Sequence, residues 1–307
     1  MGTTYKVVAL DHTRNLKEAD VKDAIDTALA EVIQSMSNWD STSEISRFNT
    51  QQGVSAQQIS PALAEVMQAA ADVNSASKGR FDTTMGPLIE LWGFGAPGYS
   101  KVPSEAELQT ARTLSGHANT LRVTGDRLRK TQAGTQVYLA AIGKGYGADH
   151  VGRALTSMGL QDFMVEIGGD LYASGKNAEG LPWQIGIEVP DASRRAVQGV
   201  IGVSGKGLAS SGDYRNYFEK DGKRYSHLID PTTGRPVQHR TASATVIAEN
   251  AMLADAWSTA MLILGREHGM EVANDHNVAV QFIDRDTSSD GAKFQSFTSV
   301  AFSDLTT

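Results

Sequence analysis

The sequence contains no cysteine, which excludes disulfide bridges, thiolate zinc sites and cysteine nucleophiles. It also has no apolar run near the roughly 18 residues that a membrane-spanning helix requires. Positive charge is scarce: 28 Lys and Arg stand against 35 Asp and Glu, so the formal net charge is -7. Nucleic-acid binding, which needs clustered cations, is therefore not expected. A nucleotide substrate is still compatible with this charge, because backbone N–H groups or a bound cation can supply local positive potential.

Processing signals are missing as well. The first residues, MGTTYKVVALDHT, lack the charged and then apolar segments of a secretory signal peptide. We therefore expect either a cytosolic protein or a mature chain whose leader has been removed. The 307 residues are 40% hydrophobic and 21% charged, which is ordinary for a soluble globular protein with one large domain or two closely joined ones.

The residue pattern changes near residue 120, after which short strands and turns predominate. Helices are expected at 18–35, 61–76 (with Ser60 as N-cap), 146–158, 252–264 and 269–276. Strands are expected at 4–9, 121–123, 163–167, 184–189, 198–203, 242–247, 278–283 and 294–302. Because strands and helices do not alternate regularly, we expect an α+β fold with mixed or antiparallel sheets and packed helices.

A late apolar helix carries the first candidate site. In AMLADAWSTAMLILG at 251–265, Asp255 and Thr259 are four residues apart and therefore share one helix face. A buried carboxylate needs a partner, and hard oxygen ligands suit Mg²⁺ or Ca²⁺ better than zinc. From these residues alone, an Asp stabilised by the helix dipole and a Thr bonded to a carbonyl is the favoured interpretation.

Two glycine-rich turns are further candidates. In VYLAAIGKGYGADHVGRAL at 137–155, a strand leads into a helix N-terminus that, with Lys144, could bind phosphate. The spacing matches neither the Walker phosphate loop nor the dinucleotide fingerprint, so ordinary turn chemistry is favoured. In EIGGDLYASG at 166–175, a strand ends in Gly168-Gly169-Asp170, which needs no function beyond a hairpin turn.

The segment 208–237 combines a hairpin signal with a candidate general base. Aromatic-rich strands flank Asp221-Gly222, and the second strand delivers His227 into a Pro-Thr-Thr-Gly turn. The pKa of a histidine lies near neutral pH, which suits a general base, although a structural histidine fits this pattern equally well. The segment 79–95 mixes polar residues with Phe81, Trp92 and Phe94, which suits a planar heterocycle or an ordinary packed loop.

Taken in order along the chain, eight segments resemble the ApbE family. They are MGTTY at 1–5, WDSTSEISRFN at 39–49, GRFDTTMGPLIELWGFG at 79–95, IGKGYGADHV at 142–151, EIGGDL at 166–171, SSGDYRNYF at 210–218, YSHLIDPTTGRPV at 225–237 and ADAWSTA at 254–260. The resemblance spans nearly the whole chain. It implies a single ApbE-like (T-fold-like) domain over 1–307, with two closely joined lobes, about 1–120 and 121–307, and the FAD site between them.

The resemblance also implies an activity. Members of the family are Mg²⁺-dependent enzymes that cleave the pyrophosphate of FAD, attach FMN by a phosphoester bond to a Thr or Ser of an acceptor protein, and release AMP. The acceptors are flavin-carrying subunits of membrane redox pumps and related flavoproteins. Members are typically exported, often as lipoproteins on the periplasmic face of the inner membrane. Hydrolysis of FAD to FMN and AMP, or FAD binding without catalysis, remain the alternatives.

By position, the resemblance implies a set of site residues. The metal ligands would be Asp255, Thr259 and the Ala141 carbonyl, with Ser258 reaching the ion through water. The FAD contacts would be Met1, Trp39, Phe81, Asp82, Thr83, Tyr138, Lys144 and Ile229. His227 would activate the acceptor hydroxyl. Relatives usually carry Asp where this chain has Tyr138, and a phenol is larger, neutral and able to stack. We therefore expect Tyr138 to alter or weaken FAD binding.

Overall fold

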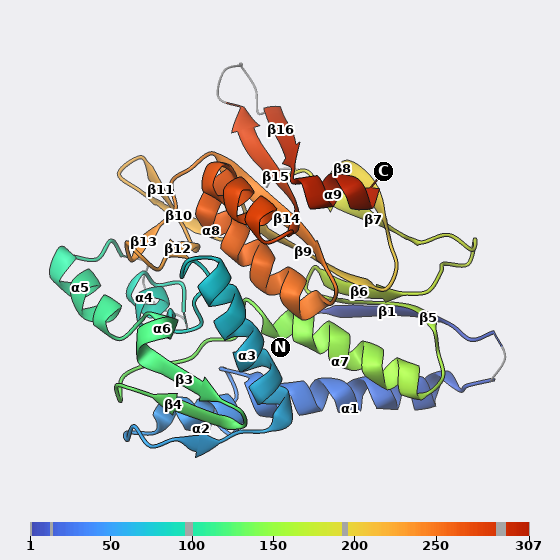
Figure 1. Ribbon diagram of the computed structural model, residues 1–307, viewed down its shortest axis with the longest axis horizontal. Coiled ribbons are helices and arrows are strands. Elements are labelled where there is room, and N and C mark those ends of the chain that lie inside the picture. Colours follow the sequence, from blue (N-terminus) through green and yellow to red (C-terminus); the bar gives the residue numbers. More distant parts are fainter. Residues whose placement is uncertain (1, 13–14, 96–100, 192–195, 287–292, 307) are drawn as a thin grey trace.

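The computed structural model describes residues 2–12, 15–95, 101–191, 196–286 and 293–306 (Figure 1). Its central element is a seven-stranded sheet in the order β1-β5-β6-β9-β14-β15-β16, in which every neighbouring pair is antiparallel. The strands are β1 (Tyr5–Leu10), β5 (Asp162–Ile167), β6 (Asp170–Ser174), β9 (Lys206–Gly212), β14 (Thr241–Ala248), β15 (Ala279–Asp286) and β16 (Lys293–Thr298). Together with the helices described below, this sheet confirms the α+β expectation.

Three helices cover one face of the sheet. The helix α7 (Gly143–Ser157) packs on β5 and β6, and α8 (Ala251–Asp275) packs on β9 and β14. The helix α1 (Glu18–Met36) lies beside α7, and its buried Ile25 and Ala28 join the same apolar cluster as Val165 of β5 (Figure 1).

A hairpin and a short helix cover the opposite face. The hairpin strands are β7 (Trp183–Glu188) and β8 (Val197–Val203), and the helix is α9 (Val300–Thr306). Because side chains alternate along a strand, Val246 of β14 packs toward α8 while Ile247 packs in the cluster that contains Trp183 of β7. The strand β14 is therefore buried on both faces.

The N-terminal part of the chain packs against α8. The helices α2 (Glu44–Thr50), α3 (Pro61–Ala76) and α6 (His117–Thr120) accompany a small sheet of β2 (Gln57–Gln58), β4 (Arg127–Lys130) and β3 (Leu121–Thr124). Two more helices precede α6 in the chain, α4 (Gly86–Leu91) and α5 (Glu105–Thr113). Two short strand pairs come later: β10 (Tyr217–Lys220) pairs with β11 (Lys223–Ser226), and β12 (Ile229–Asp230) pairs with β13 (Arg235–Pro236). Both β1–β5 and β2–β4 pair residues from opposite sides of residue 120.

Several local predictions are confirmed. The helix 61–76 begins as expected, with the Ser60 hydroxyl accepting from Leu63 N–H. Asp221 and Gly222 both have positive φ, 52° and 70°, as a tight hairpin turn requires. The break expected after residue 264 coincides with Gly265, whose φ of 70° interrupts α8.

The predicted strand 294–302 is too long. The strand β16 ends at Thr298, and residues 300–302 belong to α9. The Ser299 hydroxyl accepts a hydrogen bond from Phe302 N–H at 3.3 Å, as an N-cap does, so the chain turns into a helix at this point.

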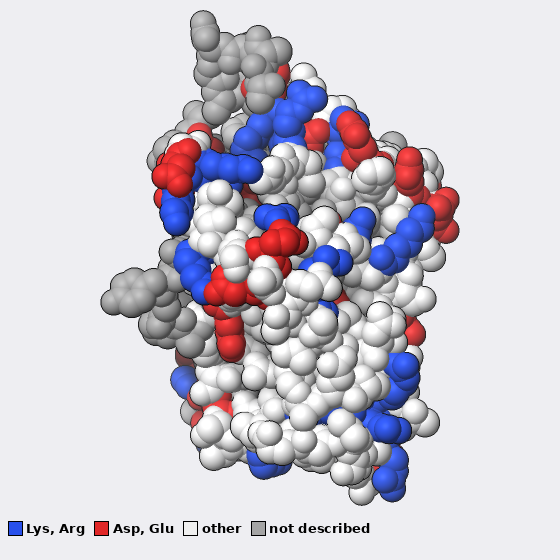
Figure 2. Space-filling model, turned by 90° about the vertical axis from the view of Figure 1, so that its left-hand side faces the viewer, with Lys and Arg blue, Asp and Glu red and all other residues white. Residues whose placement is uncertain are grey.

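Within the described ranges, none of the helices has the length and apolar character to cross a membrane. On the face drawn in Figure 2, basic and acidic side chains lie interspersed among a larger uncharged area.

The N-terminus of α8 is held by side chains that replace its missing hydrogen-bond partners. The Asp149 carboxylate of α7 accepts from the N–H groups of Ala251 and Met252, both at 2.8 Å. The Asn250 side chain accepts from Leu253 N–H at 2.8 Å. The first turn of α8 is therefore fixed to α7.

Two glycines allow the backbones around this turn to touch. A Cβ on Gly145 would lie 2.1 Å from the Ala251 carbonyl oxygen, and a Cβ on Gly207 would lie 2.2 Å from the Ala251 nitrogen. Since both neighbours are backbone atoms, neither can move without moving α8. Glycine at these positions sets the distance from α7 and β9 to Asp255, one turn further along α8.

We expect Gly207→Ala to destabilise the protein by about 1–3 kcal/mol, because the added methyl group pushes the start of α8 away from β9. Gly199→Ala is the matched control: Gly199 also lies in a strand, but nothing is within 4 Å of its Cβ position. Urea unfolding of both variants measures the difference. Equal stability of the two variants would contradict this account of the α8 contact.

Candidate active site

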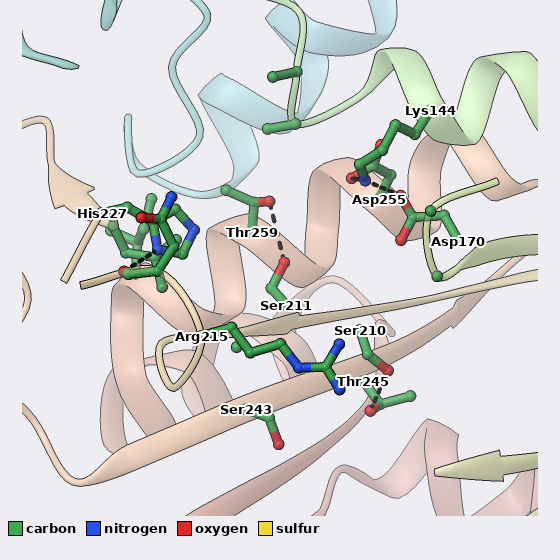
Figure 3. A pocket seen from close by; sticks show the side chains of 18 of the residues that line it. Lys144, Asp170, Ser210, Ser211, Arg215, His227, Ser243, Thr245, Asp255 and Thr259 are labelled. Atoms are coloured by element: carbon green, nitrogen blue, oxygen red, sulfur yellow. Dashed lines mark hydrogen bonds and ion pairs between the residues drawn. The ribbon is translucent and has the colours of Figure 1, made fainter. Parts of the chain in front are cut away.

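A cavity of about 760 Å³ lies where α7, α8, β9 and the segment around His227 meet (Figure 3). Most of the predicted site residues line it, although they come from distant parts of the chain. They are Trp39, Phe81, Asp82, Tyr138, Ala141, Lys144, His227, Ile229, Asp255 and Thr259. Thr83 and Ser258 do not line the cavity, and Met1 lies outside the described residues.

One end of the cavity holds a buried cluster of charges. The Lys144 ammonium forms a short ion pair with Asp170 and lies 3.5 Å from Asp255 Oδ1. Gly145 N–H donates to Asp255 Oδ2 at 3.1 Å. Both carboxylates are only 3% exposed, so the ammonium and the helix N-terminus replace the water that they have lost.

The surroundings shift the pKa values of this cluster. Burial, together with the nearby Asp255 charge, raises the pKa of Asp170 to about 8 despite the opposing effect of Lys144. Burial by itself disfavours the Lys144 ammonium, but the charges of Asp255 and Asp170 outweigh it and raise the Lys144 pKa. Lys144 therefore stays cationic at neutral pH.

The same end of the cavity fits a hard divalent cation. Asp255 and Thr259 both line it from α8, and Ala141 lines it from the turn before α7. Gly145 N–H, which would otherwise close a helical turn onto the Ala141 carbonyl, donates to Asp255 instead, and no other described donor bonds this carbonyl. These are oxygen donors of the kind that Mg²⁺ prefers.

The protein donors alone are few. The described part of the chain holds no group of three or more His, Asp or Glu side chains that could bind a metal. Water or phosphate oxygens would therefore complete the coordination of an ion at Asp255 and Thr259.

A hydroxyl network lies behind the α8 donors. Ser211 Oγ of β9 is 2.8 Å from Ser258 Oγ and 3.3 Å from Thr259 Oγ1. Ser258 is fully buried, and its hydroxyl also donates to the Asp255 carbonyl at 3.0 Å. Through Ser211, Ser258 therefore helps to hold Thr259 in place. The water-mediated contact of Ser258 with a metal stays a prediction.

His227 is held in one tautomer. Its Nδ1 lies 3.0 Å from the Asn216 carbonyl oxygen, which can only accept, so Nδ1 carries the proton and Nε2 keeps a lone pair. The backbone N–H of His227 donates to the same carbonyl at 3.1 Å. Burial lowers the pKa of His227 below its ordinary value of 6.5, so the ring is neutral at pH 7. A neutral imidazole with an available Nε2 is able to accept a proton.

The predicted flavin contacts have different surroundings. Trp39 is 68% exposed at the cavity, whereas Phe81 is 1% exposed within the core. The Asp82 carboxylate accepts from the N–H and hydroxyl of Thr84 and from His117 N–H, so its main contacts are internal. Thr83 is buried, with its hydroxyl 3.0 Å from His117 Nδ1. Asp82 and Thr83 thus shape the loop that carries Phe81.

Tyr138 is fixed inside the cavity wall. Its hydroxyl donates to Glu90, and its backbone N–H donates to the Thr83 carbonyl at 2.7 Å. Its ring lies over Gly86, where an added Cβ would be 2.5 Å from Tyr138 Cε2. Burial and Glu90 raise the pKa of the phenol, which is therefore neutral.

Several cavity residues were not singled out by the sequence. The sequence around Asp170 predicts only a hairpin turn, and nothing in that segment indicates a contact with Lys144. Arg215 Nη2 donates to both carboxylate oxygens of Glu188, at 2.6 and 2.8 Å, on the cavity wall. Ser211 and Ser243 lie on adjacent strands that only the sheet pairing brings together.

Comparison with known proteins identifies the family of this chain. The model of the ApbE family matches residues 1–282. The FAD:protein FMN transferase of Haemophilus influenzae is 42% identical over 292 residues, covering 93% of this chain and 84% of the relative. That of Vibrio cholerae is 40% identical over 284 residues, covering 92% and 85%. The solved structure of the flavin transferase ApbE from Vibrio cholerae superposes with a TM-score of 0.90 at 37% identity, covering 99% of this chain and 96% of that one. This chain belongs to the ApbE family.

Proposed function

We propose that this protein is a Mg²⁺-dependent FAD:protein FMN transferase. It cleaves the pyrophosphate of FAD and joins the FMN half through a phosphoester to a Thr or Ser hydroxyl of an acceptor protein, releasing AMP. The observation that carries the proposal is the available Nε2 of His227 in the same cavity as Lys144 and the α8 oxygen donors. The names of the relatives at 40% and 42% identity support the transfer itself.

The proposed reaction balances as a single phosphoryl-group transfer. The acceptor hydroxyl oxygen forms a bond to the FMN phosphorus, the bond from that phosphorus to the AMP phosphate oxygen breaks, and AMP leaves with the bonding electrons. The hydroxyl proton passes to His227 Nε2. Lys144 provides a fixed positive charge, and a Mg²⁺ ion held by Asp255, Thr259 and Ala141 would offset the charge of the pyrophosphate.

One incubation separates this function from its alternatives. The protein is mixed with FAD, Mg²⁺ and a bacterial membrane-protein extract, and the denatured proteins are examined for covalent flavin fluorescence. Labelled proteins together with AMP support the transfer. Free FMN and AMP without labelled protein would identify an FAD pyrophosphatase, and unchanged FAD would identify a binding protein.

The setting and acceptors belong to the same proposal. Membership of the ApbE family supports action at the periplasmic face of the inner membrane, with the native protein anchored as a lipoprotein, and flavin-carrying subunits of membrane redox pumps as acceptors. Fractionation of cells that express the natural gene tests the location. Recovery of the protein in the cytosol would contradict it.

The transfer rate should depend on the protonation of His227. Because burial lowers the pKa of His227, we expect kcat/KM to fall only as the pH drops through a value below 6.5 and to be level above it. His227→Ala should lower the rate about 10²–10⁴-fold and remove this acidic limb. A pH–rate profile of both proteins makes the comparison. An unchanged acidic limb in the variant would assign it to another group.

We expect Asp255→Asn to abolish Mg²⁺-dependent turnover, because the amide keeps an oxygen for Gly145 N–H but loses the charge that attracts the cation. Asp275→Asn, on the exposed C-terminal end of α8, is the control. FAD consumption is followed at increasing Mg²⁺ concentrations. Full activity of the Asp255 variant would remove Asp255 from the metal site.

Replacing Tyr138 should test its effect on FAD. An Asp here could accept a hydrogen bond from the ligand, which with a charged acceptor contributes about 1.5–3 kcal/mol, so Tyr138→Asp should bind FAD about tenfold more tightly or better. Tyr138→Phe removes only the hydroxyl and serves as the control. The quenching of flavin fluorescence gives both affinities. Equal affinity of the Asp variant and the unmodified protein would end this hypothesis.

A further inference from the structure

The strand β9 has an edge that is only partly paired. On one side it pairs with β14 through residues 207–212. On the other side it pairs with β6 through residues 206–208 alone. Among the described residues, no strand or other backbone group bonds residues 209–212 on that side. Two of any four consecutive strand residues direct their N–H and C=O groups to a given side, so this open edge of β9 (residues 209–212) presents unsatisfied backbone donors and acceptors.

The cavity touches both faces of the sheet at the open edge. Ser211 lies on the α8 face, where it contacts Thr259. Ser210 lies on the opposite face, with its hydroxyl 2.8 Å from Thr245 Oγ1. Both serines line the same cavity, and Figure 3 shows them on the two sides of β9. The cavity therefore wraps around the open edge.

The side away from α8 forms a polar chamber. We call it the serine chamber and define it by Ser210, Ser243, Thr245, Ile185, Gly186 and Glu188, all of which line the cavity. The ion pair of Glu188 with Arg215 lies at this part of the wall. The predicted FAD contacts and metal donors include none of these six residues, so the FAD assignment leaves the chamber without a ligand.

Ser243 places an unpartnered polar group at the chamber. Its side chain is 6% exposed, and its hydroxyl has no hydrogen-bond partner among the described residues. It lies opposite Gly212 in the β9–β14 register, so the neighbouring strand supplies no side chain to bond it. A buried hydroxyl without a partner costs free energy, and a ligand that bonds it removes this cost.

We propose that an extended segment of the acceptor polypeptide pairs with the open edge of β9. Successive side chains of a strand point to opposite faces, so the reactive Thr or Ser would face Thr259 and Asp255 while its two neighbours enter the serine chamber. The backbone of such a segment supplies the alternating donors and acceptors that the open edge lacks. The chamber hydroxyls favour small polar neighbours. This inference rests on the proposed transferase function and adds how its protein substrate is held.

The Ser243 hydroxyl provides the first test. The probe is a pool of nine-residue synthetic peptides with a central Thr and randomised flanks, and the readout is covalent flavin on peptide. Removal of one hydrogen bond, about 0.5–1.5 kcal/mol, corresponds to a roughly two- to tenfold effect, so Ser243→Ala should raise the peptide KM by that factor. FAD affinity should stay unchanged because no predicted FAD contact involves Ser243, and thermal stability should not fall because the hydroxyl has no partner within the described chain.

Thr135→Ala is the matched control. Thr135 is fully buried and its hydroxyl also lacks a partner, but it does not line the cavity. It should leave both peptide KM and FAD affinity unchanged. If Ser243→Ala instead weakens FAD by the factor expected for the peptide, the chamber holds part of the nucleotide and the proposal is overturned.

The second test measures whether backbone amides of the peptide bond to the open edge of β9. One flavinylated peptide is resynthesised with a single N-methyl group at each backbone amide in turn. Pairing with a strand edge predicts loss of transfer at every second position near the Thr and little effect between them. Uniform effects, or no effect at any position, would overturn the proposal.

The extract labelling under Proposed function distinguishes the two possible failures. If intact proteins become labelled but no peptide does, a short extended segment is insufficient and the edge-pairing inference is wrong while the transferase function stands. If no protein becomes labelled, the transferase function itself is wrong.

Discussion

The fixed first turn of α8 is the constraint on which the site depends. The Asp149 carboxylate and the Asn250 side chain satisfy the N–H groups that a helix start leaves unpaired. Close backbone contacts at Gly145 and Gly207 then fix the helix against α7 and β9. Asp255 lies one turn further along and Thr259 one more, so both oxygen donors take their positions from this contact.

The charge balance of the cavity follows from burial. Two carboxylates, Asp170 and Asp255, share one ammonium from Lys144. Burial and the nearby Asp255 charge raise the pKa of Asp170 to about 8, because the one ammonium does not neutralise both carboxylates. A divalent cation beside Asp255 would supply that charge, and it would also make the cavity acceptable to a pyrophosphate. The hydroxyls of Ser211, Ser258 and Thr259 add hydrogen bonds without changing the charge.

Local patterns in the sequence predict the long helices and five strands of the central sheet, but not the short helices α2, α4, α5 and α6 or the strands β6 and β9. The Ser60 cap, the Asp221-Gly222 turn and the break at Gly265 each depend on a few adjacent residues, and each was predictable. The site was predictable only where a family motif covers it, as at His227 and Asp255. The contact of Lys144 with Asp170 arises from the packing of α7 on β6, and the open edge of β9 arises from sheet register; both depend on distant segments. No local pattern encodes such pairing. The apolar residues 300–302 continue the strand pattern past Thr298, although the Ser299 cap starts a helix there.

The pairing of β1 with β5 has a consequence for how the protein folds. Tyr5 lies opposite Ile167, so the first strand of the chain has no partner until more than half of the polypeptide has been made. Sheets joined by such distant segments close slowly, because a long loop must be ordered before the pairing stabilises it. During synthesis β1 is therefore a hydrophobic strand without a pairing partner. The time until β5 has been made sets how long β1 can aggregate.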